Sequence, residues 1–243
     1  MADKPVFLPA GDLGVVVELG DAIKPEINLR VRNMMLALEK QRVPGVVDLV
    51  PTYRSLLVQY DPMKITYDHL VATLGEVAGS LDSIKVSSPR IVHIPTLYGG
   101  DYGPDLDFVA ENAKVATDEV VKLHSGTDYL VYMMGFTPGF PYLGGLHKKL
   151  VTPRLQTPRV RIPAGSVGIA EAQTGVYPVS SPGGWRLIGR TPLKMFDPDR
   201  DPPTLIQAGD FIRFVPLGSE KEFLDLAKRV ERGEYKPVTE PVT

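Results

Sequence analysis

Proline and glycine recur so often between residues 129 and 215 that this stretch favours short strands and turns over helices. The chain contains 23 of each, and most of them lie here or just before. Proline removes a backbone hydrogen-bond donor, and glycine favours turns over regular helix. The segments between them are short and rich in β-branched and aromatic residues, a pattern typical of small β-barrels and sandwiches. We therefore expect an all-β core in this half of the chain.

The first 90 residues show a different pattern, in which helical and strand periods alternate. Apolar residues recur at helical spacing over residues 27–38 and 70–81, each time on one face. Short β-rich runs occupy residues 14–19, 46–50, 55–60 and 91–94. The resulting order, βαββαβ, is that of the ferredoxin-like split βαβ fold. We expect residues 1–88 to form this domain, and the boundary to lie between residues 86 and 96.

The remaining chain is expected to form a second domain over residues 89–218, which makes the protein α+β overall. Two short helices are expected at its start, over residues 105–114 and 118–124. Ser219 and Glu222 have capping-box spacing, which predicts a final helix from Glu220 to about Arg232. The Pro- and Thr-rich end of the segment 219–243 is expected to be loose.

Composition excludes several classes of protein. The formal net charge of -2 offers no general basic field for nucleic acid, so we expect no nucleic-acid partner. The chain has no cysteine, which excludes disulfides, thiolate metal sites and a cysteine nucleophile. The N-terminus carries no long apolar run, so we expect a cytoplasmic protein without signal peptide or membrane anchor.

Basic residues are concentrated between residues 143 and 195. This region holds eight basic side chains, five of them arginine, against the single acidic residue Glu171. A planar guanidinium can bind carboxylate or phosphate through two parallel hydrogen bonds. The pattern therefore indicates an anionic ligand or an acidic partner surface, and the alternative is a set of solvent-facing charges balanced elsewhere in the fold.

The run GFTPGFPYLGG, residues 135–145, is too rich in proline and glycine to be a regular helix or central strand. Its aromatic residues Phe136, Phe140 and Tyr142, with Pro138 and Gly139, could form an apolar wall for a small molecule or another subunit. Alternatively, Phe136 and Phe140 close one end of a barrel.

Two further segments combine hydroxyl groups with glycine amides. They are Gln173-Thr174-Gly175 and the run from Ser180 to Trp185, which includes Ser181, Gly183 and Gly184. Such segments can form an anion-binding backbone nest, and tight turns between strands would need the same glycines.

Several common catalytic patterns are absent or incomplete. Around Ser166 the run Ala164-Gly165-Ser166-Val167-Gly168 misses the first glycine of a nucleophile elbow. The four histidines lack zinc-motif spacing, and neither the phosphate-loop pattern nor the dinucleotide glycine pattern occurs. We expect no resident metal site in this chain.

Read together, these motifs resemble one family. The segments are GFTPGFPYLGG, Pro163 to Ala170, Gln173-Thr174-Gly175, Ser181-Pro182-Gly183-Gly184-Trp185 and Ile188 to Pro192, with N-terminal matches at Val50 to Val58, Tyr98-Gly99-Gly100 and Gly103 to Leu106. They are similar to the family that comprises the 5-oxoprolinase B subunits, allophanate hydrolase subunit 1 and the kinase inhibitors of sporulating bacteria. The resemblance extends from about residue 12 to about residue 217.

This resemblance implies a ferredoxin-like N-terminal domain and a cyclophilin-like β-barrel. It implies a heteromeric complex with a related barrel subunit, of the type of the 5-oxoprolinase C subunit or allophanate hydrolase subunit 2, and a third subunit that completes ring opening. The implied reaction is ATP-dependent hydrolysis of 5-oxo-L-proline to L-glutamate, with Mg²⁺ carried by the nucleotide. Homologous segments form part of the carboxyltransferase half of biotin-dependent urea carboxylase.

On this basis we expect Arg161, Arg190 and His124 to be the catalytic residues. The two arginines are expected to hold a carboxylate or phosphate, and His124 to line the barrel mouth unless it only caps its helix. The expected binding residues are Phe136, Pro138, Gly139, Tyr142, Ser166, Gln173, Thr174, Ser181, Gly183, Gly184 and Trp185. The chain alone is expected to be folded but inactive. Two other functions remain open, a regulatory inhibitor of a histidine kinase and a carboxyltransferase subunit of a urea carboxylase or allophanate hydrolase system.

Overall fold

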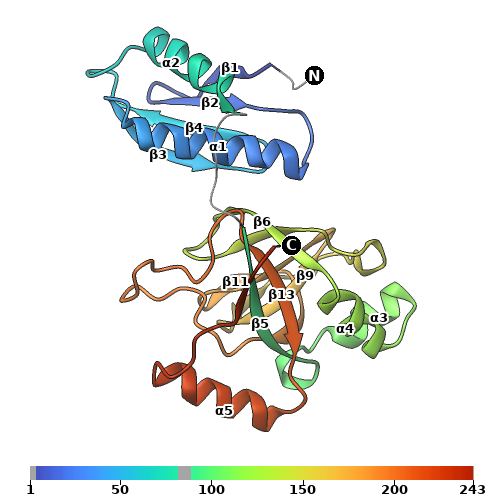
Figure 1. Cartoon of the computed structure of the whole chain (residues 1–243). Coiled ribbons are helices and arrows are strands. Elements are labelled where there is room, and N and C mark those ends of the chain that lie inside the picture. Colours follow the sequence, from blue (N-terminus) through green and yellow to red (C-terminus); the bar gives the residue numbers. More distant parts are fainter. Residues whose placement is uncertain (1–3, 82–88, 243) are drawn as a thin grey trace. The chain divides into compact units, whose positions relative to one another are not determined.

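The computed structural model of the protein describes residues 4–81 and 89–242. The chain divides into two compact units, residues 1–87 and 88–243, drawn in Figure 1 from blue to teal and from green to red. Each unit has its own hydrophobic core. The structure is therefore of mixed α and β composition, and each unit is described by itself below.

The described residues of the first unit, 4–81, form four strands and two helices. In chain order they are β1 (Val6–Pro9), β2 (Gly14–Glu18), α1 (Pro25–Gln41), β3 (Val46–Pro51), β4 (Ser55–Tyr60) and α2 (Tyr67–Gly79). The strands form one antiparallel sheet in the order β1-β2-β4-β3. Val15 and Val17 of β2 share a buried cluster with Met34 of α1 and Leu74 of α2. Because alternate residues of a strand point to opposite faces, both helices cover the same face of the sheet.

The expected last strand of this unit, residues 91–94, lies elsewhere. It belongs to β5 (Arg90–Tyr98), which is part of the second unit, whereas the fourth strand of the first sheet is β1. Successive residues of β5, from Ile94 to Thr96, are buried. Such a strand needs cover on both faces, which a sheet packed against helices on one side does not supply.

The second unit is built on short strands with helices at its surface. Its elements are β5, a 3₁₀ turn (Gly100–Tyr102), α3 (Leu106–Ala113), α4 (Thr117–Ser125), β6 (Asp128–Met134), β7 (Pro141–Gly144), a 3₁₀ turn (Lys148–Leu150), β8 (Arg159–Ile162), β9 (Ser166–Ala170), β10 (Gln173–Val176), β11 (Ser181–Gly183), β12 (Arg186–Arg190), β13 (Phe211–Pro216), α5 (Glu220–Glu231) and β14 (Thr239–Pro241). The two short helices expected before the barrel thus correspond to α3 and α4.

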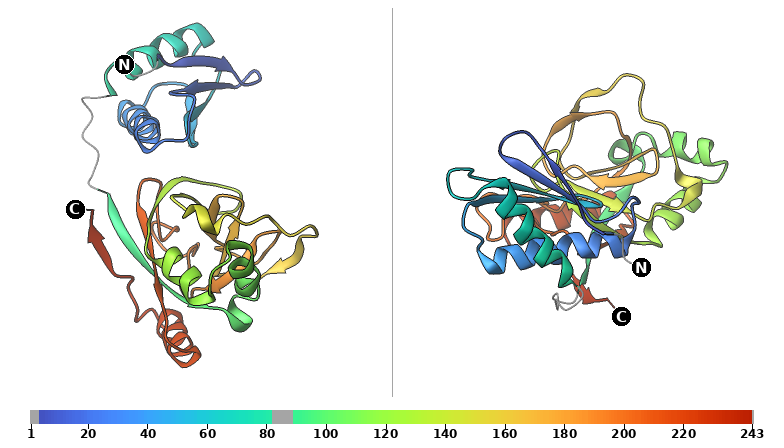
Figure 2. Two further views of the ribbon diagram at one scale, coloured as in Figure 1. Left: turned by 90° about the vertical axis from the view of Figure 1, so that its right-hand side faces the viewer. Right: turned by 90° about the horizontal axis from the view of Figure 1, so that it is seen from above.

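Seven of these strands close into a barrel. Their order is β12-β9-β10-β7-β6-β13-β5, and pairing of β5 with β12 completes the ring. The pair β13–β5 is parallel, and the other pairs are antiparallel. The interior is filled by large side chains such as Tyr129, Phe214 and Ile169. The α+β class and the β-barrel expected from the sequence are therefore confirmed. Strands β8 and β11 lie outside the ring and form a separate two-stranded ribbon (Figure 2).

The C-terminal segment is more ordered than expected. The Ser219 side chain accepts a hydrogen bond from the Glu222 amide at 3.2 Å, which confirms the predicted cap of α5. The expectation of a loose tail is wrong, because β14 pairs with the first residues of β5. Glu240 of β14 also contacts the guanidinium of Arg213 in β13, so an ion pair supports the backbone pairing.

None of the helices within residues 4–81 and 89–242 combines the length and the apolar composition that a membrane crossing requires.

Candidate functional site

A hollow of about 550 Å³ lies between one side of α5 and the segment that follows β12. We call it the α5 hollow. Its polar lining includes Ser180, Arg190, Lys194, Asp197 and Glu231. The remaining wall is largely apolar. A mostly apolar concavity with a few polar groups is the usual form of a small-molecule site.

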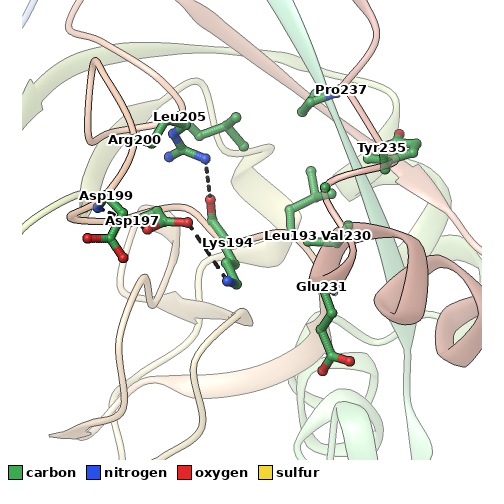
Figure 3. A pocket seen from close by; sticks show the side chains of 11 residues that line it. Leu193, Lys194, Asp197, Asp199, Arg200, Leu205, Val230, Glu231, Tyr235 and Pro237 are labelled. Carbon is green, nitrogen blue, oxygen red and sulfur yellow. Dashed lines mark hydrogen bonds and ion pairs between the residues drawn. The ribbon is translucent and has the colours of Figure 1, made fainter.

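A second hollow of about 410 Å³ adjoins the first and shares Lys194 and Asp197 with it (Figure 3). The Lys194 Nζ lies 3.8 Å from the Asp197 Oδ2, so this cation is partly neutralised. The guanidinium of Arg200 donates to the backbone oxygens of Lys194 at 3.2 Å and Pro203 at 2.9 Å. Arg200 therefore stabilises the loop around the hollow and is not free to bind an anion.

Arg190 ends strand β12 and reaches the α5 hollow. Its Nε donates to the backbone oxygen of Ala164 at 2.9 Å, and it forms no ion pair within the described part of the chain. Burial and the hydrogen bond to Glu220 raise the pKa of nearby Tyr102, an effect that the positive charge of Arg190 opposes. The two terminal nitrogens of Arg190 are thus available for an anion.

Arg161 lies on β8, just before the turn formed by residues 163–165, and Arg190 bonds to Ala164 of that turn. Its Nε donates to the Ser180 hydroxyl at 3.1 Å, and Ser180 lines the α5 hollow. The side chain is exposed, and no carboxylate contacts it in residues 4–81 or 89–242. The structure therefore brings the two arginines singled out from the sequence to one turn, Pro163 to Gly165, beside one hollow.

Gly165 holds that turn in place. Its amide donates to the Tyr177 oxygen at 2.7 Å, and its own oxygen accepts from the Thr191 amide at 2.9 Å. Its φ is +82°, and a Cβ at this position would lie 2.2 Å from the Thr191 oxygen. Only glycine fits both the left-handed conformation and the close backbone approach.

The loop over residues 135–140 supports the wall of the α5 hollow. Its turn is closed by the Phe140 amide, which donates to the Thr137 oxygen at 3.0 Å, and Gly139 has a φ of +83°. A Cβ on Gly139 would lie 2.9 Å from the Cβ of Phe196 and 3.3 Å from that of Pro178, both of which line the hollow. The loop thus contacts the outer side of the wall, and Pro138 is exposed beside it.

The aromatic residues of this region do not form an open wall. Phe140 and Trp185 are 2% and 7% exposed and pack edge to face, with Tyr177 and the half-buried Tyr142 against the same cluster. Burial raises the pKa of Tyr177 to about 12. Phe136 alone is exposed, at 64%, with a φ of +65°. Phe140 packs with Ala170 and Leu187 in a cluster separate from the barrel core, so the alternative interpretation, that these rings close a barrel end, is not borne out for Phe140 or for the exposed Phe136.

The two hydroxyl- and glycine-rich segments are strands rather than ligand-binding loops. Gln173 and Thr174 begin β10, while Ser181 and Gly183 lie on β11. The Gly184 oxygen accepts from the Leu155 amide at 2.7 Å. The predicted anion nest is therefore wrong for Gln173 and Thr174, because β10 pairs with β9 on one side and β7 on the other. It stays a prediction for residues 180–185, since the Gly184 contact involves its oxygen and not the amide groups that bind an anion.

Ser166 also lies in the barrel wall. It begins β9, is 2% exposed and does not line the α5 hollow. A nucleophile must be exposed to its substrate, so the burial of Ser166 agrees with the incomplete elbow pattern around it.

His124 is buried in the barrel core, so the expectation that it lines the barrel mouth is wrong. It is 0% exposed, and burial lowers its pKa to about 3. The Thr174 hydroxyl donates to the Gly168 oxygen at 3.1 Å and therefore accepts from His124 Nε2 at 2.8 Å. His124 Nδ1 then accepts from the Tyr98 hydroxyl at 2.8 Å, and the His124 oxygen accepts from Tyr129. The imidazole is neutral, and both of its nitrogens are hydrogen-bonded.

Two arginines of the basic region form ion pairs within the fold. Arg159 lies 2.9 Å from a carboxylate oxygen of Asp105, and Arg186 lies 3.8 Å from the other. Asp105 also accepts from the Leu187 amide at 2.7 Å, and Arg186 stacks on the Phe108 ring at 3.6 Å. The basic region is therefore not one uniform anion-binding surface.

Sequence reasoning did not identify the contribution of α5. Glu231 and Phe223 of this helix line the α5 hollow, and Ser180 tethers Arg161 beside it. The face that a helix turns toward another element cannot be assigned to a particular cavity from periodicity alone. Within the described residues, no group of three or more His, Asp or Glu side chains could hold a metal ion.

Comparison with known proteins now identifies the family. The family described as carboxyltransferase domain, subdomain C and D, matches residues 5–206. The 5-oxoprolinase B subunit of Bacillus subtilis (strain 168) is 42% identical over 88% of this chain and 92% of its own length. The chain belongs to the 5-oxoprolinase B-subunit family of carboxyltransferase-domain proteins. A second relative, the 5-oxoprolinase B subunit of Escherichia coli O157:H7, is 42% identical over 85% of this chain and 93% of its own.

Solved structures agree with this assignment of family and fold. A conserved uncharacterized protein from Pyrococcus horikoshii is 46% identical, with a TM-score of 0.54, over 90% of this chain and 100% of its own. The urea carboxylase of Kluyveromyces lactis reaches a TM-score of 0.77 at 21% identity and covers 98% of this chain and 24% of its own. At that identity the likeness shows that the fold is shared.

Proposed function

We propose that this chain is the B subunit of an ATP-dependent 5-oxoprolinase, which hydrolyses 5-oxo-L-proline to L-glutamate. The observation that carries the proposal is 42% identity to a 5-oxoprolinase B subunit over 92% of that protein's length. The pair of arginines without carboxylate partners in the described residues, at one turn beside the α5 hollow, supports it from the structure.

The chemical groups of the substrate determine which residues such a site needs. A lactam is a stabilised amide, and 5-oxo-L-proline also carries a carboxylate. In the proposed site Arg190 and Arg161 bind and orient this carboxylate, or a phosphate group, through their terminal nitrogens. Their fixed positive charges stabilise negative charge that develops on oxygen during reaction. Ser180, which already accepts from Arg161, keeps that guanidinium in position.

The charges present fit a nucleotide phosphate as well as a carboxylate. Arg161, Arg190 and Lys194 are the residues that would hold the phosphates, and ATP when bound supplies the phosphoryl group that activates the lactam oxygen. We propose that Mg²⁺ enters with the nucleotide and is shared with another subunit. The positively charged side chains of this chain then neutralise and align the phosphates, and they do not act as bases.

The proposal extends to assembly. We propose that the chain acts in the cytoplasm with a related barrel subunit and a third, ring-opening subunit, and that it is inactive alone. We also propose that the first unit is a permuted ferredoxin-like fold, in which β1 takes the place beside β2 that the last strand would occupy.

The test is reconstitution. The chain is co-expressed with its two companion subunits, and ADP and glutamate formation are measured with and without 5-oxo-L-proline. We expect release of both products to depend on the substrate and on all three subunits. Absence of turnover in the complete complex refutes the proposal.

A second candidate function is the carboxyltransferase step of a urea carboxylase. The urea amidolyase of Saccharomyces cerevisiae is 24% identical over 97% of this chain, although the chain matches 14% of that protein. A biotinylated carrier and urea would then replace 5-oxo-L-proline in the assay. We rank it second because the identity to the 5-oxoprolinase B subunits is higher and spans nearly their whole length.

A further inference from the structure

The ribbon formed by β8 and β11 has an unpaired edge. Strand β8 pairs with β11 on one side, and on its other side no strand of residues 4–81 or 89–242 is bound. Val160, in the middle of β8, is 91% exposed. Figure 2 (left) shows the ribbon, yellow to orange, at the edge of the barrel unit. An exposed β-branched residue on an open edge strand is a template for pairing with another strand.

The ribbon is held rigidly by the barrel. Arg159 binds the Asp105 carboxylate and also donates to the Trp185 oxygen at 3.3 Å. A Cβ on Gly183 would lie 2.4 Å from the Tyr177 hydroxyl, so β11 lies directly against the aromatic cluster. A strand fixed in this way loses little conformational entropy when a partner binds.

The charge around the ribbon is one-sided. Residues 145–171 include five basic residues and one acidic residue, Glu171, whose backbone pairs with that of Thr152. Of the five, Arg159 is neutralised by Asp105, whereas Lys148, Lys149 and Arg154 form no ion pair within the described residues. An acidic partner would complement this surface.

A second copy of the chain is a poor occupant of this edge. Antiparallel self-pairing centred on Val160 would bring the basic segments of two copies together, including Arg154 and Arg161 of each copy, which have no carboxylate partner in the described residues. Like charges close to one another destabilise a strand pair. Pro158 and Pro163 also limit the open edge to the four residues of β8, which disfavours extended aggregation.

We propose that the free edge of β8 is a docking surface for an extended, acidic segment of the companion barrel subunit. The segment adds a strand to the ribbon, an apolar side chain contacts Val160, and acidic side chains meet the basic residues that precede β8 in the sequence, such as Arg154. This inference rests on the proposed function for the existence of the companion. Because β8 leads directly into the turn beside Arg161, the docked subunit is placed next to the α5 hollow.

The experiment measures binding of the purified companion to the full chain by isothermal titration calorimetry. We expect Val160→Asp to raise Kd at least about tenfold, because a carboxylate on the edge repels an acidic strand. Val160→Thr keeps β-branching and should change Kd by less than about threefold. The matched control is Val47→Asp, since Val47 is 68% exposed on β3, an edge strand of the first unit.

Two further measurements complete the test. Arg154→Glu should weaken binding by about fivefold, and raising salt from about 50 to 300 mM should weaken the wild-type complex and reduce this difference. Equal Kd values for wild type and Val160→Asp, or equal effects of Val160→Asp and Val47→Asp, overturn the docking surface. Absence of any complex with the companion overturns it as well.

The docking surface and the proposed function can be refuted independently of each other. If Val160→Asp is active only at raised companion concentration, the defect lies in assembly, as the docking surface requires. If the wild-type chain binds the companion normally but the complete complex shows no turnover with 5-oxo-L-proline, the proposed function fails. The comparison of Kd values for wild type and Val160→Asp still decides the role of β8.

Discussion

His124 makes the stability of the barrel sensitive to mild acid. Its imidazole is completely buried between Tyr98 and Thr174, and burial lowers its pKa from the ordinary 6.5 to about 3. In the unfolded chain the same group is expected to titrate near its ordinary pKa. Below pH 6.5 the unfolded state therefore binds a proton that the folded state excludes, and stability is lost as the pH falls.

The magnitude follows from the separation of the two pKa values. Each pH unit between them costs ~1.4 kcal/mol once the unfolded histidine is fully protonated. From pH 6.5 to roughly pH 5, where the unfolded imidazole changes from half to almost fully charged, the loss is about 1.6 kcal/mol. Well above pH 6.5 this contribution is nearly constant.

The assay compares wild type with His124→Gln by urea denaturation over that range. His124→Gln should be destabilised at neutral pH, since a buried hydrogen-bond network is cut, but its unfolding free energy should lack the loss of about 1.6 kcal/mol between the two pH values. The chain's other three histidines remain in both proteins, so the difference between the two curves isolates His124. Parallel curves for the two proteins would refute the buried, neutral assignment.

Three other changes test the site and its supports. Arg190→Ala should lower kcat/KM for 5-oxo-L-proline in the assembled enzyme about 10- to 100-fold with little change in Tm, whereas Lys40→Ala, at an exposed position of α1, should not; equal rates would remove Arg190 from the site. Asp105→Ala should reduce the free energy of unfolding by about 3 kcal/mol in urea, because two partly buried arginines lose their counter-charge, and an unchanged midpoint contradicts this. Gly165→Ala should reduce the free energy of unfolding in urea by at least about 2 kcal/mol, since the added Cβ meets the Thr191 oxygen. A urea midpoint equal to that of wild type contradicts the close approach.

Local patterns in the sequence predicted most individual elements. The apolar spacing over residues 27–38 lies within α1, and the runs 46–50 and 55–60 correspond to β3 and β4. The cap at Ser219 correctly predicted the start of α5. These signals succeed because they depend on neighbouring residues alone, through backbone period and capping.

Partner choice between strands was not predictable in the same way. β5 was assigned to the first sheet because it follows α2, but it pairs with β13, more than a hundred residues later. β1 and β14 were missed because each is short and lies among prolines, a pattern that loops share. Pairing of such strands is decided by tertiary contacts.

In the candidate site, too, local sequence signals were predictive and long-range contacts were not. Arg161 and Arg190 were identified by residue type and lie at one turn, whereas Arg159 and Arg186 have the same residue type but are neutralised by Asp105. Asp105 is separated from them by some fifty to eighty residues, so no local pattern could separate the two pairs. His124 was open between two roles for the same reason, since its burial depends on strands from across the barrel.

The parallel contact between β5 and β13 governs the order in which the protein can mature on the ribosome. The four described strands of the first unit lie within residues 6–60, so their sheet can form soon after the unit's own residues leave the exit tunnel. The barrel, in contrast, begins with β5 and needs β13 to close, so its first strand waits until residue 216 has been synthesised. A nascent chain arrested near residue 206 would carry a finished N-terminal unit joined to an open, unclosed barrel.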